Sequence, residues 1–349
     1  MISNILSLKR EHLFVSRAAS ALYLIAKCEC LAGKKVLFPC NICYAAIFPF
    51  LYAGCIPVFC DTDLLTGNIT LAEIQNSEGR SAVVAAHMYG EPIKDIAEIK
   101  KYCSAQGILL IEDCASAMGA EIDGIPCGSF GDYSIFSTGY SKTIDIGFGG
   151  IILSDRSLLA MSKAEQALPP KSASFEADEA FFGRMYRLIR NSPNQTLSSH
   201  IWEGFRENLR HLFLFRIDFE EAKKIKDSLG GLSDIIEQRR AENSLYSELL
   251  GDISWIKQYN RSAGSVPWRF CFFVGEELRT ELIGFMLERS LPVSDWYPIV
   301  TDIFGSADKA AFPNTRIFEK QILNLPLMTG KDRIKQICGV IHEFDEREV

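Results

Sequence analysis

The chain has 349 residues, of which 48% are hydrophobic and 23% charged, and its formal net charge is −7. This ordinary composition excludes a disordered chain and a fibrous repeat, and the length predicts one large domain and one smaller domain. A negative net charge without a basic cluster argues against nucleic acid or an anionic membrane as the main partner, because both require concentrated Lys and Arg.

The beginning of the chain lacks the charged-then-apolar order of a signal peptide, and no uncharged stretch is long enough to span a bilayer. We therefore expect no membrane segment and a cytoplasmic location. Eleven cysteines are present, and several of them, such as Cys55, Cys60 and Cys271, lie in apolar runs. This pattern is typical of reduced, buried thiols rather than of a disulfide framework.

Short apolar runs alternate with helix-like segments over residues 18–155. The runs are apolar on both faces, which is typical of strands in a mostly parallel sheet covered by helices, and the spacers are long enough for crossover helices. One spacer, 93–102, has apolar residues at helical spacing with charges opposite. The predicted strands are 36–38, 57–60, 82–85, 108–111, 133–136 and 149–153.

The segment 156–215 is rich in Arg, Ser and Asn and contains helical patches such as 180–186, and we interpret it as irregular helix and loop. A charge-laced helical pattern then runs over 219–250, with an interruption at Gly230 and Gly231, and indicates a connector that leads out of the large domain.

The last hundred residues alternate a strand signal at 270–273 with helical patterns at 277–289 and 330–345, which indicates a small α+β domain. We find no internal repeat. The predicted organisation is a large α/β domain over 1–215, a connecting helix over 216–250 and a small C-terminal domain over 251–349.

Asp113 and Lys142 point to a cofactor. Asp113 closes the apolar run 108–111, and Lys142 lies in the connection between the last two predicted strands. Ligands of open α/β sheets lie beyond the carboxyl ends of strands, where both Asp113 and His87 are expected. Pyridoxal phosphate needs a lysine to hold its aldehyde as a Schiff base and a carboxylate to keep its ring nitrogen protonated. An acid at a strand end is also a common loop cap or salt-bridge partner, and most lysines are solvated.

The phosphate of such a cofactor needs hydrogen-bond donors. A helix that begins near Ala18 offers N–H groups and a positive dipole end, and the hydroxyls of Ser20 and Ser137 and the charge of Arg17 supplement them. The alternative is that Ser16 and Ser20 only cap this helix.

Closely spaced cysteines, Cys28 with Cys30 and Cys40 with Cys43, raise the alternative of a structural zinc site. We expect no metal, because a Cys-x-Cys pair on a helix points its thiols to different faces and both pairs lie in apolar surroundings. Neither a P-loop nor a GxGxxG fingerprint is present, which argues against nucleotide hydrolases and dinucleotide enzymes.

The chain resembles the DegT-type, or StrS-type, pyridoxal-phosphate sugar aminotransferases over nearly its whole length. The order and spacing of five segments carry the resemblance. They are 33–39 leading to 54–61, then 87–92, 112–115, 128–132 running to Lys142, and 323–327.

The resemblance implies a fold-type I large domain, a small C-terminal domain, and a homodimer with active sites at the subunit interface. By residue matching, Lys142 is the Schiff-base lysine, Asp113 the partner of the pyridinium nitrogen, and Ser137 a hydroxyl that contacts the phosphate. Enzymes of this family move an amino group, usually from glutamate, to a nucleotide-linked keto-sugar. Such a reaction serves the synthesis of an amino sugar for a surface polysaccharide or a glycosylated metabolite.

In that reaction Lys142 leaves the cofactor and carries a proton between carbon atoms, which requires a neutral amine during turnover. His87, Tyr89 and Tyr297 are the expected substrate contacts.

Several positions around the cofactor depart from the family's pattern. Ala18 and Ala19 replace a Gly-Thr pair, and Cys43, next to Tyr44, replaces an aromatic residue that stacks on the cofactor ring. We still expect Ala18, Ala19, Cys43 and Ser116 to border the cofactor. The other departures are Ser116 for Gln, Met118 for His, Phe148 for Glu, and Leu214 for an Asn supplied across the dimer interface.

These changes remove polar contacts and a stacking surface, and they leave two other hypotheses open. One is a non-catalytic or regulatory relative that uses the fold for binding. The second is a sugar dehydratase that keeps the cofactor, although family members with that chemistry replace the lysine with histidine.

Overall fold

The larger part of the molecule is built on a seven-stranded sheet with strand order β1-β9-β8-β5-β4-β2-β3. The computed structural model describes residues 5–190, 207–304 and 311–348. The strands from β8 to β3 run parallel, whereas β9 is antiparallel to both β8 and β1. The mostly parallel sheet and its six predicted strands are confirmed, and β1 is an additional strand. The strands are β1 (Glu11–Val15), β2 (Lys35–Pro39), β3 (Ile56–Cys60), β4 (Arg80–Ala86), β5 (Leu109–Asp113), β8 (Tyr133–Ser137) and β9 (Gly150–Ser154).

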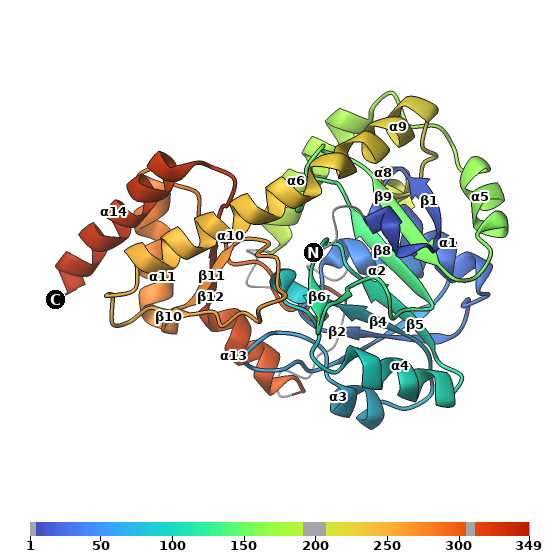
Figure 1. Ribbon diagram of the computed structural model, residues 1–349, viewed down its shortest axis with the longest axis horizontal. Coiled ribbons are helices and arrows are strands. Elements are labelled where there is room, and N and C mark those ends of the chain that lie inside the picture. Colours follow the sequence, from blue (N-terminus) through green and yellow to red (C-terminus); the bar gives the residue numbers. More distant parts are fainter. Residues whose placement is uncertain (1–4, 191–206, 305–310, 349) are drawn as a thin grey trace.

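Helices cover both faces of this sheet (Figure 1). Because side chains alternate along a strand, Val36 and Phe38 of β2 enter one hydrophobic core and Leu37 enters another. Helices α1 and α2 close the first core, and α3 and α4 close the second. These helices are α1 (Ala18–Cys28), α2 (Tyr44–Tyr52), α3 (Leu71–Asn76) and α4 (Ile96–Ala105).

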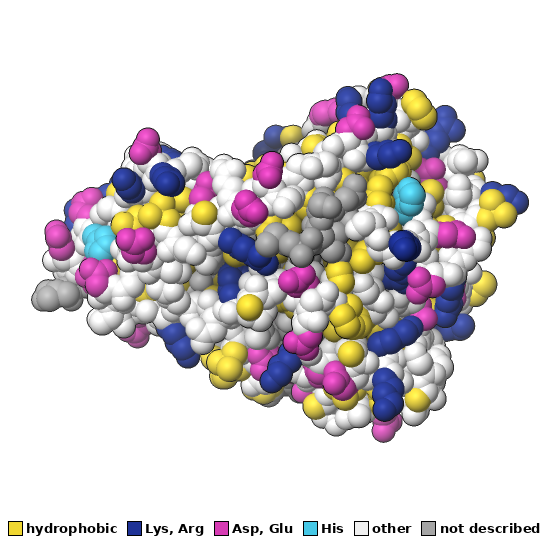
Figure 2. All heavy atoms as spheres, in the orientation of Figure 1, with side chains coloured by type: hydrophobic (Ala, Val, Ile, Leu, Met, Phe, Trp, Pro, Cys, Tyr) yellow, Lys and Arg dark blue, Asp and Glu magenta, His cyan; other side chains and the backbone are white. Residues whose placement is uncertain are grey.

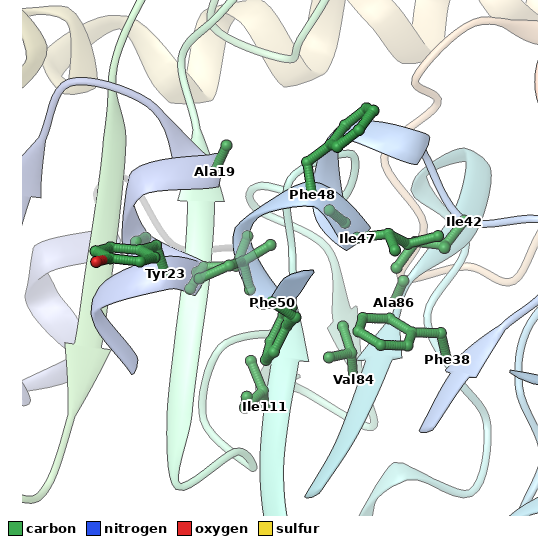
Figure 3. Close-up of a cluster of buried hydrophobic side chains, with 14 of the residues drawn as sticks. Ala19, Tyr23, Phe38, Ile42, Ile47, Phe48, Phe50, Val84, Ala86 and Ile111 are labelled. Atoms are coloured by element: carbon green, nitrogen blue, oxygen red, sulfur yellow. The ribbon is translucent and has the colours of Figure 1, made fainter. Parts of the chain in front are cut away.

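Figure 3 shows the first core, in which side chains of α1 and α2 meet those of β2, β4 and β5. The rings of Phe38 and Phe50 pack edge to face with centroids 5.1 Å apart. Full burial of one such side chain stabilises the fold by about 1.5–3 kcal/mol. The core thus fixes the starts of α1 and α2 against the strand ends.

The predicted helical patch at 180–186 is confirmed, but it belongs to a longer, regular helix of 16 residues, α6 (Phe175–Arg190), so the interpretation as irregular is wrong there. Its residues Phe175, Phe182 and Tyr186 recur at helical spacing and are buried against the first core, so the signal was present in the sequence. Residues 191–206 lie outside the described part of the chain. The neighbouring elements are α5 (Leu159–Gln166), η3 (Glu207–Leu209) and α8 (Arg210–Phe213).

The predicted helical pattern over 219–250 and its interruption are confirmed. Helix α9 (Phe219–Ser228) is followed by a 3-10 turn, η4 (Leu229–Gly231), and by α10 (Leu232–Leu249). The N-terminus of α9 carries a capping box, in which Asp218 and Glu221 each accept from the other's backbone N–H. Figure 1 shows α10 running from the large sheet to the C-terminal elements.

The C-terminal elements form a three-stranded antiparallel sheet, β10-β11-β12, packed against helices. The predicted strand at 270–273 and the two predicted helices are confirmed. These elements are β10 (Lys257–Gln258), β11 (Phe270–Phe273), α11 (Glu276–Glu288), α12 (Thr301–Phe304), α13 (Pro313–Gln321), β12 (Ile322–Leu325) and α14 (Lys331–Glu348). Short elements elsewhere are η1 (Ile5–Leu8), η2 (Met88–Gly90), β6 (Glu121–Ile122) and β7 (Ile125–Pro126).

Strand β11 is buried on both faces by different cores. Phe270 and Phe272 belong to the C-terminal core with residues of α10, α11 and α14. Cys271 and Phe273 belong to the core of the large sheet. The C-terminal part is therefore packed onto the large sheet through a shared strand.

On the face shown in Figure 2, Lys and Arg side chains are interspersed with Asp and Glu, and no broad area of one charge is visible. None of the helices in the described ranges is long and apolar enough to cross a membrane.

Gly90 offers a test of how the two parts of the chain are joined. Its φ is +80°, and a Cβ placed on it would lie 1.8 Å from the carbonyl oxygen of Val266. Replacement Gly90→Ala is therefore expected to lower the free energy of unfolding by about 1–2 kcal/mol for the left-handed backbone and by about 1–3 kcal/mol more for the clash. Urea unfolding monitored by circular dichroism measures this loss.

The matched control is Gly33→Ala. Gly33 also has a positive φ, +73°, but a Cβ on it would meet no atom within 4 Å. Equal losses for the two variants would show that the contact between η2 and Val266 does not restrict the chain.

Candidate active site

The candidate site lies where β5 ends and the β8–β9 connection begins. Asp113 is the last residue of β5 and pairs in register with Ala86 of β4 and Ile135 of β8. Lys142 lies in the connection, where its charge lowers the pKa of Asp113 and the charge of Asp113 raises the pKa of Lys142. The structure thus brings together the two residues that the sequence selected.

The amine of Lys142 is surrounded by hydroxyls. Its Nζ donates to Ser116 Oγ at 3.2 Å, and the hydroxyl of the buried Tyr297 lies beside both Lys142 and Ser116. Burial opposes the charge of the ammonium, but Tyr297, Cys43 and Asp113 outweigh burial and raise the pKa of Lys142. Lys142 therefore rests as a cation and must lose a proton before it acts as a nucleophile or base.

Asp113 has an unsatisfied acceptor inside the site. Its Oδ1 accepts from the N–H of Ala115 at 2.9 Å, whereas no group in the described ranges donates to Oδ2. Burial raises the pKa of the carboxyl, while the Ala115 N–H and the charge of Lys142 oppose that effect. A buried carboxylate in this state is suited to a cationic N–H donor such as a pyridinium.

A phosphate-sized group has donors nearby. Gly150 of β9 lies between Val15 of β1 and Ser137 of β8, and a Cβ on it would lie 2.5 Å from the Ala18 nitrogen. Only glycine therefore lets the start of α1 approach Ser137. The first N–H groups of α1 have no partner within the helix. Ser137 Oγ accepts from the Gly139 N–H at 3.2 Å, which leaves its own proton to donate.

The expectation that Ser20 supplements the phosphate site is wrong. The Ser20 hydroxyl donates to the carbonyl of Phe213 at 2.7 Å, so its single proton is used. Ser16 donates to the Phe215 carbonyl, and Arg17 donates to the Leu212 carbonyl at 2.9 Å. The alternative that these serines cap α1 is also wrong, because the N-cap residue is Arg17 and makes no side-chain cap. Their hydroxyls instead hold residues 212–215 against the start of α1.

The positions that depart from the family's pattern lie around the same site. Cys43 is the N-cap residue of α2, and its thiol interacts electrostatically with Lys142 and Asp113. Burial raises the pKa of this thiol against the lowering effect of Lys142, so it is neutral. The adjacent Tyr44 packs instead against Tyr186 of α6, with ring centroids 4.4 Å apart and the ring planes tilted by 32°.

Ala19 is buried at the start of α1, and Ala18 is partly buried beside it. Met118 is buried in an apolar cluster against which Phe148 packs. Leu214 is buried in the core of its own chain. These substitutions replace polar contacts by apolar packing, and among them only Ser116 forms a hydrogen bond with Lys142.

His87 and Tyr89 are buried next to the site. Nδ1 of His87 accepts from the Ile93 N–H at 2.9 Å, so its ring proton is on Nε2 and is donated to Glu112 Oε1 at 3.0 Å. Tyr89 is fully buried, and its hydroxyl accepts from the Tyr297 N–H at 3.2 Å. Of the three expected substrate contacts, only Tyr297 reaches the Lys142 amine.

Glu112 is a buried anion next to Asp113. Besides His87 it accepts the backbone N–H groups of Gly128, Phe130 and Gly131 at 2.6–2.9 Å. Burial works against its charge, but His87 and these N–H groups prevail and lower the pKa of Glu112 to about 2. The proximity of His87, Glu112 and Cys114 does not make a metal site, because Ile93 already occupies the lone pair of the His87 ring.

Three residues that could not be identified from the sequence hold the lysine loop, the β8–β9 connection over 138–149 that carries Lys142. Arg239 of α10 donates to the Lys142 carbonyl at 2.7 Å, the Trp268 indole donates to the Ser141 carbonyl at 2.6 Å, and Arg269 donates to Ser141 Oγ at 2.8 Å. A cavity of about 490 Å³ lies between this loop and the C-terminal part. Only the position of Trp268 and Arg269 directly before the strand signal at 270–273 offered a hint of their role.

A lysine and an unsatisfied aspartate at the strand ends of this sheet, with phosphate donors at the start of α1, define the class: a pyridoxal-phosphate-dependent aminotransferase. The chain matches the DegT/DnrJ/EryC1/StrS aminotransferase family over residues 8–342 and belongs to it. When bound, the cofactor supplies an electron sink that stabilises negative charge on the substrate carbon. Lys142 and Asp113 fit its aldehyde and ring nitrogen, and Ala18, Ala19 and Ser137 fit its phosphate.

Similar proteins in this family are sugar-modifying enzymes. GDP-perosamine synthase of Vibrio cholerae is 25% identical over 95% of this chain and 85% of its own length. GDP-perosamine synthase of Escherichia coli O157:H7 is 31% identical, with shares of 89% and 79%. A dTDP-4-dehydro-2,3,6-trideoxy-D-glucose 4-aminotransferase of Saccharopolyspora spinosa is 26% identical, with shares of 95% and 83%.

Solved structures show the same fold. DesI, crystallised in the presence of its TDP-sugar product, superposes with a TM-score of 0.77 at 21% identity, over 97% of this chain and 81% of its own. Helicobacter pylori PseC, an aminotransferase, gives a TM-score of 0.76 at 15% identity, with shares of 99% and 92%. The fold-type I architecture expected from the sequence is thereby confirmed.

Replacement Tyr297→Phe tests the control of the Lys142 charge. Tyr297 is the first of the groups that raise the pKa of Lys142, so its loss lowers that pKa. Only the neutral amine attacks an aldehyde, and the rate of cofactor uptake therefore rises with pH. In the variant this rise is expected at lower pH, as measured by stopped-flow absorbance on cofactor-free protein.

Tyr259→Phe is the control, because the Tyr259 hydroxyl donates to the carbonyl of Thr66 instead. An unshifted profile for Tyr297→Phe contradicts the assignment.

Replacement Glu112→Gln is expected to lower the free energy of unfolding at pH 7 by about 2–3 kcal/mol, because an amide cannot accept all the bonds that the buried carboxylate receives. The folded-state pKa of Glu112 is lowered to about 2, so its contribution is complete above the unfolded-state pKa of about 4.3 and is lost as the pH falls towards 2. The difference between wild type and variant should shrink between about pH 4.3 and 2 in urea titrations. A constant difference would indicate that Glu112 is not ionised in the folded protein.

Proposed function

We propose that this protein transfers an amino group to a nucleotide-linked keto-sugar in the biosynthesis of an amino sugar. The single observation that carries the proposal is the contact between Lys142 Nζ, Ser116 and Tyr297 beside the unsatisfied carboxylate of Asp113. The substrate class is supported by relatives whose names include GDP-perosamine synthase and a dTDP-sugar 4-aminotransferase.

In the proposed reaction Asp113 and Lys142 have different roles. Asp113 holds the positive charge of the ring nitrogen, which a buried carboxylate does more strongly than water. Once Lys142 has been displaced from the cofactor, its amine takes a proton from one carbon and returns it to another. The Ser116 hydroxyl accepts a hydrogen bond from that amine, and the hydroxyl of Tyr297 lies beside it.

Glutamate is the proposed amino donor. Glutamine is the second donor to test, because an L-glutamine:2-deoxy-scyllo-inosose aminotransferase of Streptomyces kanamyceticus is 32% identical over 77% of this chain. Synthesis of a surface polysaccharide remains the proposed context.

We also propose a cytoplasmic homodimer with active sites at the interface. All eleven cysteines are free, which supports a reducing compartment. The division into 1–215, 216–250 and 251–349 remains a proposal, and the separate C-terminal core around Phe272 supports it.

Cofactor capture by Lys142 is the decisive test. Purified protein supplied with pyridoxal phosphate is expected to absorb visible light, to lose that absorbance on borohydride reduction, and to carry a pyridoxyl adduct on Lys142 by peptide mass spectrometry. Lys142→Ala should lose transamination while keeping the wild-type circular dichroism spectrum.

The matched control is Lys163→Ala, which removes an exposed lysine of α5. It should keep both the adduct and the activity. Turnover that survives in Lys142→Ala would show that another lysine acts. A colourless protein that cannot be reconstituted would instead favour the non-catalytic relative.

A further inference from the structure

Arg269 is a cation without an acidic partner. It directly precedes β11, and its guanidinium lies 4.6 Å from the centre of the Trp268 ring. It donates to Ser141 Oγ at 2.8 Å and to Ser294 Oγ at 2.5 Å, both of which are neutral acceptors. No carboxylate of residues 5–190, 207–304 or 311–348 lies within ion-pair distance of it. Two of its five N–H groups are thus used on weak acceptors.

Within the described ranges, Arg239 and Arg261 also donate only to carbonyls, whereas several other shielded arginines have a counterion. Arg10, Arg279 and Arg316 each pair with a carboxylate and are mostly shielded from solvent. A shielded guanidinium that has only hydroxyl partners retains most of its charge uncompensated, which costs free energy unless an anion completes the site. Burial correspondingly lowers the pKa of Arg269.

The surroundings of Arg269 offer space for such an anion. The guanidinium lines the cavity of about 490 Å³ beside the lysine loop, a volume typical of ligand sites. The charged residues that line this cavity are Lys142, Arg239, Arg269 and Asp145, so cations predominate. Asp145 already accepts the N–H groups of Ser141 and Gly147, at 2.7 and 3.0 Å. These two N–H groups of the loop therefore partly compensate the negative charge of Asp145.

We propose that Arg269 binds an oxyanion of a substrate in this cavity, either the carboxylate of the amino donor or the diphosphate of the nucleotide-linked sugar. The inference rests on the proposed function for the identity of these substrates. A guanidinium presents a planar pair of N–H donors that matches both oxyanions. Arg269 also contacts Ser141, the residue that precedes Lys142. An anion bound to Arg269 would therefore lie beside the loop that carries Lys142.

The test separates the two sources by direct binding. Protein loaded with cofactor and reduced with borohydride has its phosphate site filled and cannot turn over. Isothermal titration of this protein with inorganic pyrophosphate models the diphosphate, and titration with 2-oxoglutarate models the donor's carboxylates. Arg269→Gln is expected to weaken binding of one probe by about 10- to 100-fold, the worth of a charged hydrogen bond. Weaker pyrophosphate binding identifies the diphosphate, and weaker 2-oxoglutarate binding identifies the donor.

Two further variants make the outcome decisive. Arg289→Gln removes one positive charge from the C-terminal part, where Arg289 pairs with Glu343 away from the cavity, and should leave both titrations unchanged. Arg269→Lys keeps the charge and should bind with intermediate affinity, which also covers the case in which Arg269→Gln fails to fold. Unchanged affinities in the Arg269 variants, or a wild-type protein that binds neither probe, would overturn the proposal.

Failure of the proposed function gives a different result. In that case the protein takes up no cofactor, and the same titrations on the unloaded protein still report whether Arg269 binds the probes.

Discussion

The buried charge of Glu112 is the constraint on which the active-site geometry depends. Desolvating a carboxylate at the end of β5 is tolerable only because His87 and the backbone N–H groups of the loop before β8 surround it. Those bonds fix three strand ends and their loops around one point. Asp113, the next residue, is thereby aimed into the site, and Ser137 at the end of β8 is held beside the start of α1.

The parallel sheet and its helices could be predicted because strands such as β4 and β5 are apolar on both faces, a local signal. Strand β1 was missed because Glu11 and His12 interrupt its apolar pattern, and its pairing with β9 is a long-range contact. Helix α6 was predicted only as a helical patch at 180–186, although its aromatic residues recur at helical spacing from Phe175 onwards. The Arg, Ser and Asn content of the whole segment was given more weight than this periodicity.

The site could be predicted only in part. Lys142 and Asp113 could be selected because the cofactor needs a lysine and a carboxylate, and because both residues follow predicted strands. Tyr297 was predicted as a substrate contact. The clamp of Arg239, Trp268 and Arg269 on the lysine loop could not be predicted, because it depends on α10 and β11 folding back over a distant segment. His87 ends an apolar run just as Asp113 does. Only the structure shows that both of its ring nitrogens have partners within the protein, Glu112 and the Ile93 N–H.

The double burial of β11 limits how this enzyme can open. A hinge that swung the C-terminal sheet away would expose Cys271 and Phe273 to water, at about 25 cal/mol for each Å² of apolar surface. Substrate entry and product exit therefore favour movement of loops over rotation of a whole domain. The loop that carries Lys142 is itself held by Arg239 of α10 and by Trp268 and Arg269 next to β11. Ligand entry and exit are therefore expected to depend on segments at the mouth of the cavity and not on this loop.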